Sequence, residues 1–187
     1  GMEERFTLKD AAAVFDFERV NKAGARFDWD KLNWLNSQVL HALPAETLLE
    51  ELTPLWLGQG WALPDTPGWT LDLCRLLKPS LTLLKDGIEQ AEPFFLCPEM
   101  EDDGRQQLEV EGARPAIAQL LEKLEVDPWS GEDPETGKIL LADAAKAAGV
   151  KKGVVMKTLR AALLGRLQGP DLITTWSLLA PVGQDLA

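Results

Sequence analysis

Apolar residues recur at three- and four-residue spacing along most of this chain, which is the period of a helix with one buried face. The clearest stretch covers 150–165. One face of that helix is expected to carry Val154, Val155, Thr158, Leu159, Ala162 and Leu163. Gly165 can take the left-handed conformation that ends a helix. The Gly-Pro-Asp sequence at 169–171 then breaks the chain and begins a helix over 172–179.

The same period predicts further helices, with Gly- and Pro-containing intervals between them. The expected ranges are 6–15, 28–43, 45–57, 69–77, 81–85, 114–126 and 139–148. The buried stripe of the helix at 28–43 is expected to be Leu32, Leu35, Val39 and Leu43. Pro54 should sit at a break or kink, and the acidic, irregular segment 86–112 predicts a linker or a surface excursion between two helical units. No alternating strand pattern exceeds four residues, so we predict an all-α fold of two helical bundles.

Charge is unevenly distributed along a chain whose net charge is −11. Between residues 138 and 166 there are seven basic residues and one acid, Asp143, which gives +6. Between 86 and 135 there are 15 acids and 3 bases, which gives −12. The basic stretch has two interpretations, and both stay open at this point. It is either a docking surface for phosphates or unpaired bases, or a solvated helix face.

Composition excludes several functional classes. No apolar run approaches the length of a membrane span, and the N-terminus has no signal-peptide pattern, so we expect a cytoplasmic protein without a membrane partner. Cys74 and Cys97 lack metal-ligand spacing and are expected to be reduced thiols. His41 is the only histidine and has no nucleophile near it in sequence. We therefore expect no metal site and no catalytic residue in this chain.

Two segments near opposite ends of the chain resemble one enzyme family. The segment 19–36, RVNKAGARFDWDKLNWLN, is similar to the one that follows the KMSKS loop in bacterial glutamyl-tRNA synthetases. The segment 151–172, KKGVVMKTLRAALLGRLQGPDL, resembles the C-terminal pattern of the same family, and WSLLAP follows it. Thr158 and Leu164 depart from that pattern, where the family has Pro and Thr, so entry into the helix is expected to differ slightly.

The resemblance implies the part of a class I synthetase that follows its catalytic domain. Both catalytic motifs, HIGH and KMSKS, are absent from this sequence. The expected organisation is stem-contact helices over 1–43, a first anticodon-binding helical domain over 44–98 and a second over 99–187. The chain alone is expected to bind tRNA without aminoacylating it. ATP and Mg would belong to the parent enzyme, and this chain would hold no cofactor.

The resemblance also assigns tRNA contacts to particular residues. The family's Arg that contacts the middle anticodon base falls on Arg160, and the loop that receives the first base falls on Gly169, Pro170 and Leu172. Arginine suits this role because its planar guanidinium stacks on a base and donates to its edge. Lys157 is a further predicted anticodon contact. The predicted contacts with the tRNA stem are Lys22, Arg26, Lys31 and Asn36.

Ser80 is the departure from the family with the largest functional consequence. Members that accept only tRNA-Glu carry an Arg where Ser80 aligns, and that Arg selects the third anticodon base. Ser80 has no guanidinium, so one hypothesis is that the parent enzyme also charges tRNA-Gln. An alignment shifted by two residues would instead bring Lys78 or Lys85 near this position.

The expected partner is therefore tRNA-Glu, with tRNA-Gln as a second one left open, and the chain is expected to be a monomer that does not bind DNA. Two alternatives remain on sequence alone. One is a free-standing helical adaptor that binds protein through surfaces near Trp56, Trp61 and Trp69. The other is a degenerate, non-catalytic paralogue of the synthetase. Salt dependence separates RNA binding from a hydrophobic protein interface, because phosphate contacts weaken steeply as salt rises.

Overall fold

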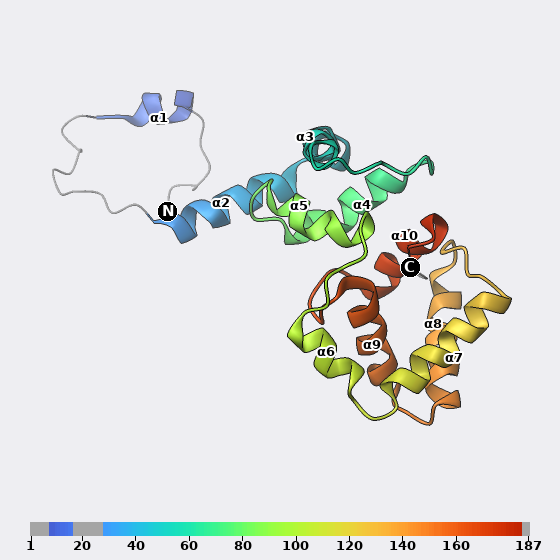
Figure 1. Cartoon of the computed structure of the whole chain (residues 1–187). Helices are drawn as coiled ribbons and strands as arrows, with labels where there is room; N and C mark the ends of the chain where they lie inside the picture. Colours follow the sequence, from blue (N-terminus) through green and yellow to red (C-terminus); the bar gives the residue numbers. More distant parts are fainter. Residues whose placement is uncertain (1–7, 17–27, 185–187) are drawn as a thin grey trace. The chain divides into compact units, whose positions relative to one another are not determined.

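The computed structural model describes residues 8–16 and 28–184, and this part of the chain is helical with no strand (Figure 1). The all-α prediction is confirmed. The α-helices are α1 Leu8–Val14, α2 Trp29–Ala42, α3 Ala45–Gly58, α4 Trp69–Leu77, α5 Asp86–Ala91, α6 Asp102–Leu108, α7 Ala113–Val126, α8 Pro134–Ala147, α9 Lys152–Leu164 and α10 Leu172–Leu179. Short 3-10 helices follow as η2 Lys78–Ser80, η3 Glu92–Phe94 and η4 Ala180–Val182.

The chain divides into two units, Gly1–Asp30 and Lys31–Ala187, and each is described by itself. In the first unit, α1 is a two-turn helix followed by exposed Phe15. The second unit contains α3 to α10 and most of α2. The domain boundaries proposed at residues 43 and 98 stay predictions.

The packing of α3 against α5 depends on a close approach at Gly87. Leu48, Leu52 and Trp56 are fully buried on α3, as the apolar period predicts. A Cβ atom on Gly87 would lie 2.4 Å from Leu52 Cδ2, so a larger residue would have to displace this buried side chain. Trp56 Nε1 donates a hydrogen bond to the Gly87 carbonyl oxygen at 2.9 Å. Pro54 lies inside α3, and the helix continues through it without a break.

The interpretation of 86–112 as a linker is wrong. The segment forms α5, η3 and α6, and Phe94 is 1% exposed. The helices are hard to recognise because their buried positions are occupied mostly by small or polar residues. Gly87, Gly104 and Gln107 all face the interior. The amide of Gln107 donates to Thr158 Oγ1 on α9 at 3.1 Å, which satisfies both buried groups.

One further predicted helix does not form, and one predicted helix start is wrong. The piece expected at 81–85 is a turn in which the Asp86 carboxylate accepts hydrogen bonds from two backbone N–H groups at 82 and 83. The helix expected to start at residue 139 begins five residues earlier, at Pro134. Asp133 caps it by accepting from the N–H groups of residues 135 and 136, and proline fits the first helical position.

The buried faces of α2 and α9 differ from the expected stripes. On α2, Leu32 and Val39 are 43% and 53% exposed, while Leu40 is 7% exposed. On α9, Ala162 is exposed, whereas Ala161 and Leu164 are buried. Because α9 packs against α6, α7 and α8, its buried surface is wider than a single stripe. The predicted end of α9 at left-handed Gly165 is confirmed.

Several tryptophans pack in the interior of the second unit. Trp176 is fully buried, and the Trp129 ring meets it edge-on with centroids 4.4 Å apart. Trp56 and Trp69 are 0% and 2% exposed, and Trp61 stacks on Phe95 at 4.9 Å. The adaptor hypothesis needed a surface of these tryptophans. Trp56 and Trp69 belong to the core and Trp61 is half-buried against Phe95, so this basis for the hypothesis is wrong.

One contact between α4 and α10 bears directly on the functional site. Trp69 Nε1 donates to the Leu178 carbonyl oxygen at 2.6 Å, across 109 residues of sequence. This bond is buried, which makes its loss costly. It holds α10 against the helices that precede residue 98.

Candidate nucleic-acid interface

The loop between α9 and α10 is shaped by residues at both of its ends. Gly165 ends α9 with φ of +71°, and its N–H bonds to the Ala161 carbonyl oxygen. Asp171 begins α10, because its carboxylate accepts from the Thr174 backbone N–H at 2.9 Å. That N–H lowers the pKa of Asp171 most, and the nearby Arg160 guanidinium lowers it further. The loop is therefore a fixed structure between two capped helix ends.

Arg160 is bound to this loop. The side chain leaves α9 half-buried, and its Nη1 donates to the Pro170 carbonyl oxygen at 2.5 Å. A guanidinium has five N–H donors, so this bond leaves most of them for other partners. The structure thus brings together two of the predicted anticodon residues, Arg160 and Pro170.

Gly169 is the position in this loop that excludes other residues. Its φ is +152°, which side chains rarely adopt. A Cβ there would lie 2.7 Å from Leu164 Cδ1 and 3.5 Å from Arg160 Nη1. Glycine is required for both the backbone conformation and the close contact with α9.

An open groove of about 1,090 Å³ lies between this loop and the α4–α5 region. It brings Ser80 to the same surface as Gly169 and Pro170, about 90 residues away in sequence. The residues that line the groove come from two regions of the chain and one loop between them. The first region is α4, η2, α5 and η3, the second is the end of α9 with the following loop and α10, and the loop between them is 131–132. The lining residues used below are Arg75, Leu76, Pro79, Ser80, Gln90 and Arg166.

Acidic residues outnumber basic ones in the lining of the groove, and both of its arginines are paired with carboxylates. Arg75 pairs with Asp72 at 3.0 Å and with Glu46 at 3.3 Å. Arg166 is 25% exposed and lies 3.4 Å from Glu101 and 3.7 Å from Glu89. Each arginine therefore faces two carboxylates, and neither is a free cation for a phosphate. Bases, which are neutral and planar, suit such a surface better than the backbone of a nucleic acid does.

Exposed lysines lie on the α8–α9 side of the loop. Lys152 Nζ donates to the Lys138 carbonyl oxygen at 3.2 Å, which brings the start of α9 to α8. Lys138 pairs with Glu135 at 2.6 Å, and this pair raises the pKa of Lys138, with smaller help from Asp171. Lys157 is exposed on α9, three residues before Arg160. Lys138, whose pKa is affected by Asp171, is the one of these three lysines that the structure places near the loop.

The other sequence-predicted residues are placed differently. Leu172 is 2% exposed, so its side chain belongs to the core and only its backbone adjoins the loop. Asn36 Nδ2 donates to the Thr82 carbonyl oxygen at 2.5 Å and so holds α2 to the turn at 81–85. Lys31 is exposed. Lys22 and Arg26 lie outside the described residues.

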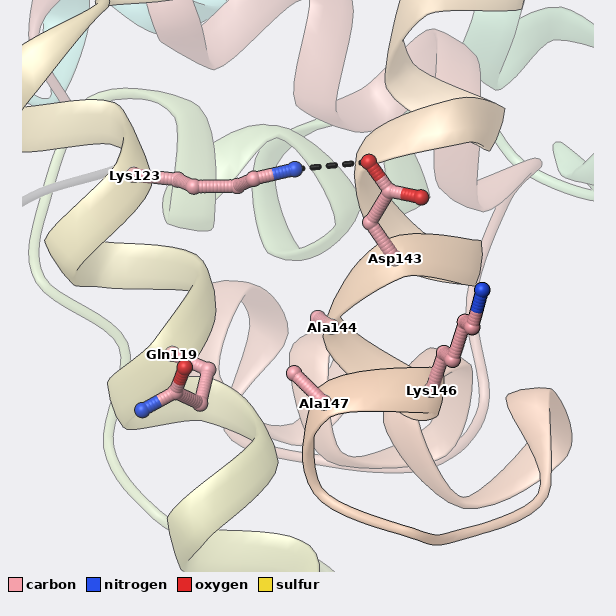
Figure 2. Close-up of a pocket in the computed structure, with 6 residues that line it drawn as sticks. All are labelled: Gln119, Lys123, Asp143, Ala144, Lys146 and Ala147. Carbon is pink, nitrogen blue, oxygen red and sulfur yellow. Dashed lines mark hydrogen bonds and ion pairs between the residues drawn. The ribbon is translucent and has the colours of Figure 1, made fainter.

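A second hollow, of about 410 Å³, lies between α7 and α8 (Figure 2). Lys123 of α7 reaches across to Asp143 of α8, with Nζ 2.6 Å from Oδ2 (Figure 2). The pair lowers the pKa of Asp143. Both side chains are about half exposed, which is typical of a surface ion pair. Ala144 and Ala147 also line the hollow, together with the polar side chains of Gln119 and Lys146 (Figure 2).

Sequence reasoning missed the groove residues that come from the segment taken as a linker. Gln90 lies on α5, and Glu89 beside it pairs with Arg166. No periodic signal marked this helix. The only usable signal was the Pro93-Phe94-Phe95 sequence, which is too apolar for a solvated linker.

Comparison with known families supplies the decisive observation. The sequence pattern of the anticodon binding domain family matches residues 47–182, which is most of the chain. The chain belongs to this family. Glutamate–tRNA ligases from Parasynechococcus marenigrum (strain WH8102) and Synechococcus sp. (strain CC9605) are 74% and 68% identical to it. Both alignments cover 100% of this chain and 39% of the relative, so the chain spans well under half of their length.

Solved structures agree with this assignment. The crystal structure of a glutamate tRNA ligase from Elizabethkingia meningosepticum CCUG26117, in complex with its amino acid, aligns with a TM-score of 0.75 and 27% identity. The alignment covers 92% of this chain and 34% of that one. The resemblance to glutamyl-tRNA synthetases found in the sequence is confirmed.

In the described part of the chain, no helix is long and apolar enough to cross a membrane. Within the same residues, His, Cys, Asp and Glu form no group of three or more that could hold a metal ion.

Proposed function

We propose that this chain is the tRNA anticodon-binding portion of a glutamate–tRNA ligase and forms the C-terminal part of that enzyme. The observation that carries the proposal is the single groove that joins Ser80 to Gly169 and Pro170. Arg160 is fixed to the same loop by its bond to Pro170. Residues assigned separately to different anticodon bases thus line or adjoin one surface. ATP, Mg and glutamate would be held by the rest of the enzyme.

In this proposal the groove receives unpaired anticodon bases and the lysines beside it contact the RNA backbone. The groove suits bases because its arginines are already paired with carboxylates. Lys157 is exposed, and Lys152, which donates one N–H to the Lys138 carbonyl oxygen, keeps two donors for a phosphate. Phosphate contacts of this kind release counterions, so affinity should fall steeply with salt.

We further propose that the parent enzyme accepts both tRNA-Glu and tRNA-Gln. The support is that Ser80 lines the groove and carries no guanidinium. Lys78, one of the two lysines that a shifted alignment would bring near this position, donates its Nζ to the Leu43 carbonyl oxygen at 2.5 Å. That bond directs Lys78 into a structural contact with the end of α2. Comparable charging of the two tRNAs by the parent enzyme would support the proposal, and strict preference for tRNA-Glu would refute it.

The experiment is a fluorescence-anisotropy titration of this chain with tRNA-Glu and tRNA-Gln transcripts at two salt concentrations. We expect binding to both that weakens with salt. Arg160→Ala should weaken both by about tenfold or more, since a lost guanidinium–base contact costs roughly 1–3 kcal/mol.

Arg114→Ala is the matched control for Arg160→Ala. Arg114 is 70% exposed and pairs with Glu109 outside the groove lining. It should leave the affinity for both transcripts nearly unchanged. No binding by the wild-type chain, or equal losses in both variants, would contradict an anticodon-binding groove.

A further inference from the structure

Ser80 and Gln90 form a coupled pair at the wall of the groove. Ser80 Oγ lies 2.5 Å from Gln90 Oε1 and 2.7 Å from the Leu77 carbonyl oxygen. A hydroxyl has one proton to donate, and both neighbours are acceptors. The proton of Ser80 is therefore taken up by contacts within the protein. Ser80 is poorly suited to donate to a base while these contacts persist.

Gln90, by contrast, keeps donors available. Its Oε1 is held by Ser80, which leaves the Nε2 group with two N–H donors. Within the described part of the chain, the side chain of Gln90 makes no other hydrogen bond that would use these donors. Gln90 is half-buried and lines the groove, so its amide is fixed at one end and accessible at the other.

The surroundings of Gln90 suit a base. Leu76 and Pro79 give this wall an apolar surface, against which a planar base can lie. The nearest formal charge on α5, Glu89, is paired with Arg166 at 3.7 Å. A neutral amide beside apolar surface and a compensated ion pair favours a base over a phosphate.

We propose that Gln90 is a specificity residue, whose side-chain amide, held by Ser80, donates a hydrogen bond to an anticodon base that tRNA-Glu and tRNA-Gln share, and so not to the third base. The inference rests on the proposed function and deepens it. The recognised atom is an acceptor at one place on the edge of the base, a keto oxygen or a ring nitrogen, so a base that presents a donor at that place is rejected. Ser80 then acts as a positioning residue, because it holds the amide in place without contacting the base.

The test uses anticodon stem–loop RNAs in which each anticodon base of tRNA-Glu is replaced in turn. Gln90→Glu keeps the shape of the side chain and its contact with Ser80 but removes both donors. We expect this variant to bind the best RNA about three- to tenfold more weakly, the usual effect of one lost hydrogen bond or base contact. Its preference at one anticodon position should disappear, while the preferences at the other two remain.

Gln106→Glu is the matched control, because it adds the same charge at an exposed position on α6 outside the groove lining. It should leave the preferences at all three positions unchanged. Gln90→Leu removes the donors without adding charge and should reproduce the loss of preference. Equal weakening of every RNA by Gln90→Glu, or unchanged preferences, would overturn the proposal.

A double-mutant cycle tests the role of Ser80. If Ser80 acts through Gln90, Ser80→Ala should weaken binding in the wild-type chain and have little effect in the Gln90→Leu chain. Additive effects would contradict the positioning role. Failure of the wild-type chain to bind any of the RNAs would instead refute the proposed function, so the two failures are distinguishable.

Discussion

Replacing Gly169 with alanine should damage both stability and RNA binding. The new methyl group would lie 2.7 Å from Leu164 Cδ1, a buried side chain, on a backbone with φ of +152°. An unfavourable backbone conformation costs about 1–3 kcal/mol, and moving Leu164 off its rotamer adds roughly 0.5–1.5 kcal/mol. We expect the free energy of unfolding to fall by about 2–4 kcal/mol.

Gly149→Ala separates backbone strain from the local contact. Gly149, which lies before the opposite end of α9, also has a positive φ, +68°, but a Cβ there would meet no atom within 4 Å. Its substitution should cost about 1–2 kcal/mol and leave RNA binding unchanged. Gly169→Ala should additionally weaken anticodon stem–loop binding about tenfold, because a displaced Pro170 carbonyl no longer fixes Arg160.

Urea unfolding followed by tryptophan fluorescence measures the stability of both variants, and anisotropy measures their RNA affinity. We expect the Gly169→Ala variant to be the less stable of the two, and the only one that binds RNA more weakly than the wild-type chain. If Gly169→Ala were no less stable than Gly149→Ala and bound RNA normally, the inferred link between this loop and Arg160 would be refuted.

Three further predictions concern stability and reactivity. The pKa of Asp171 is lowered in the folded chain, so the ionised carboxylate should stabilise the fold above about pH 4, and this stabilisation should be lost at lower pH. In an acid titration, the Asp171→Asn variant should therefore lose less free energy of unfolding below about pH 4 than the wild-type chain does. Burial raises the pKa of Cys74 to about 11, so a thiol reagent at pH 8 should modify only exposed Cys97 until the chain is unfolded. Equal rates of modification of the two cysteines in the folded chain would contradict this. Trp69→Phe should cost about 1–3 kcal/mol in urea unfolding, since it leaves the Leu178 carbonyl unpaired, and a neutral effect would show that this bond does not hold α10.

The sequence predicted helices well where one apolar face dominates. α4 over 69–77 and α10 over 172–179 match their predicted ranges, and α9 ends at Gly165 as expected. These helices combine regular spacing with Gly or Pro at their ends, so local signals and packing agree.

Prediction failed where tertiary contacts replace an apolar face. α5 and α6 bury Gly87, Gly104 and Gln107, none of which contributes to an apolar period. The opposite case is α2, where Leu32 and Val39 have the right spacing but remain exposed. Burial depends on what packs against a helix, and a single sequence does not contain that information.

Only part of the candidate site could be predicted from the sequence. The family pattern assigned Arg160, Gly169 and Pro170, and the structure brings them together. Gln90 was missed because its helix was taken as a linker. Its meeting with Ser80 depends on the packing of α5 beside η2, which local spacing does not predict.

The most direct test of the account is photo-cross-linking from the anticodon itself. A tRNA-Glu transcript carrying 4-thiouridine in place of one anticodon base is irradiated with this chain, and the cross-linked peptides are mapped by mass spectrometry. The account predicts cross-links to the groove, within 72–93, 131–132 or 164–178. Cross-links confined to the hollow between α7 and α8, or to α2, would contradict it.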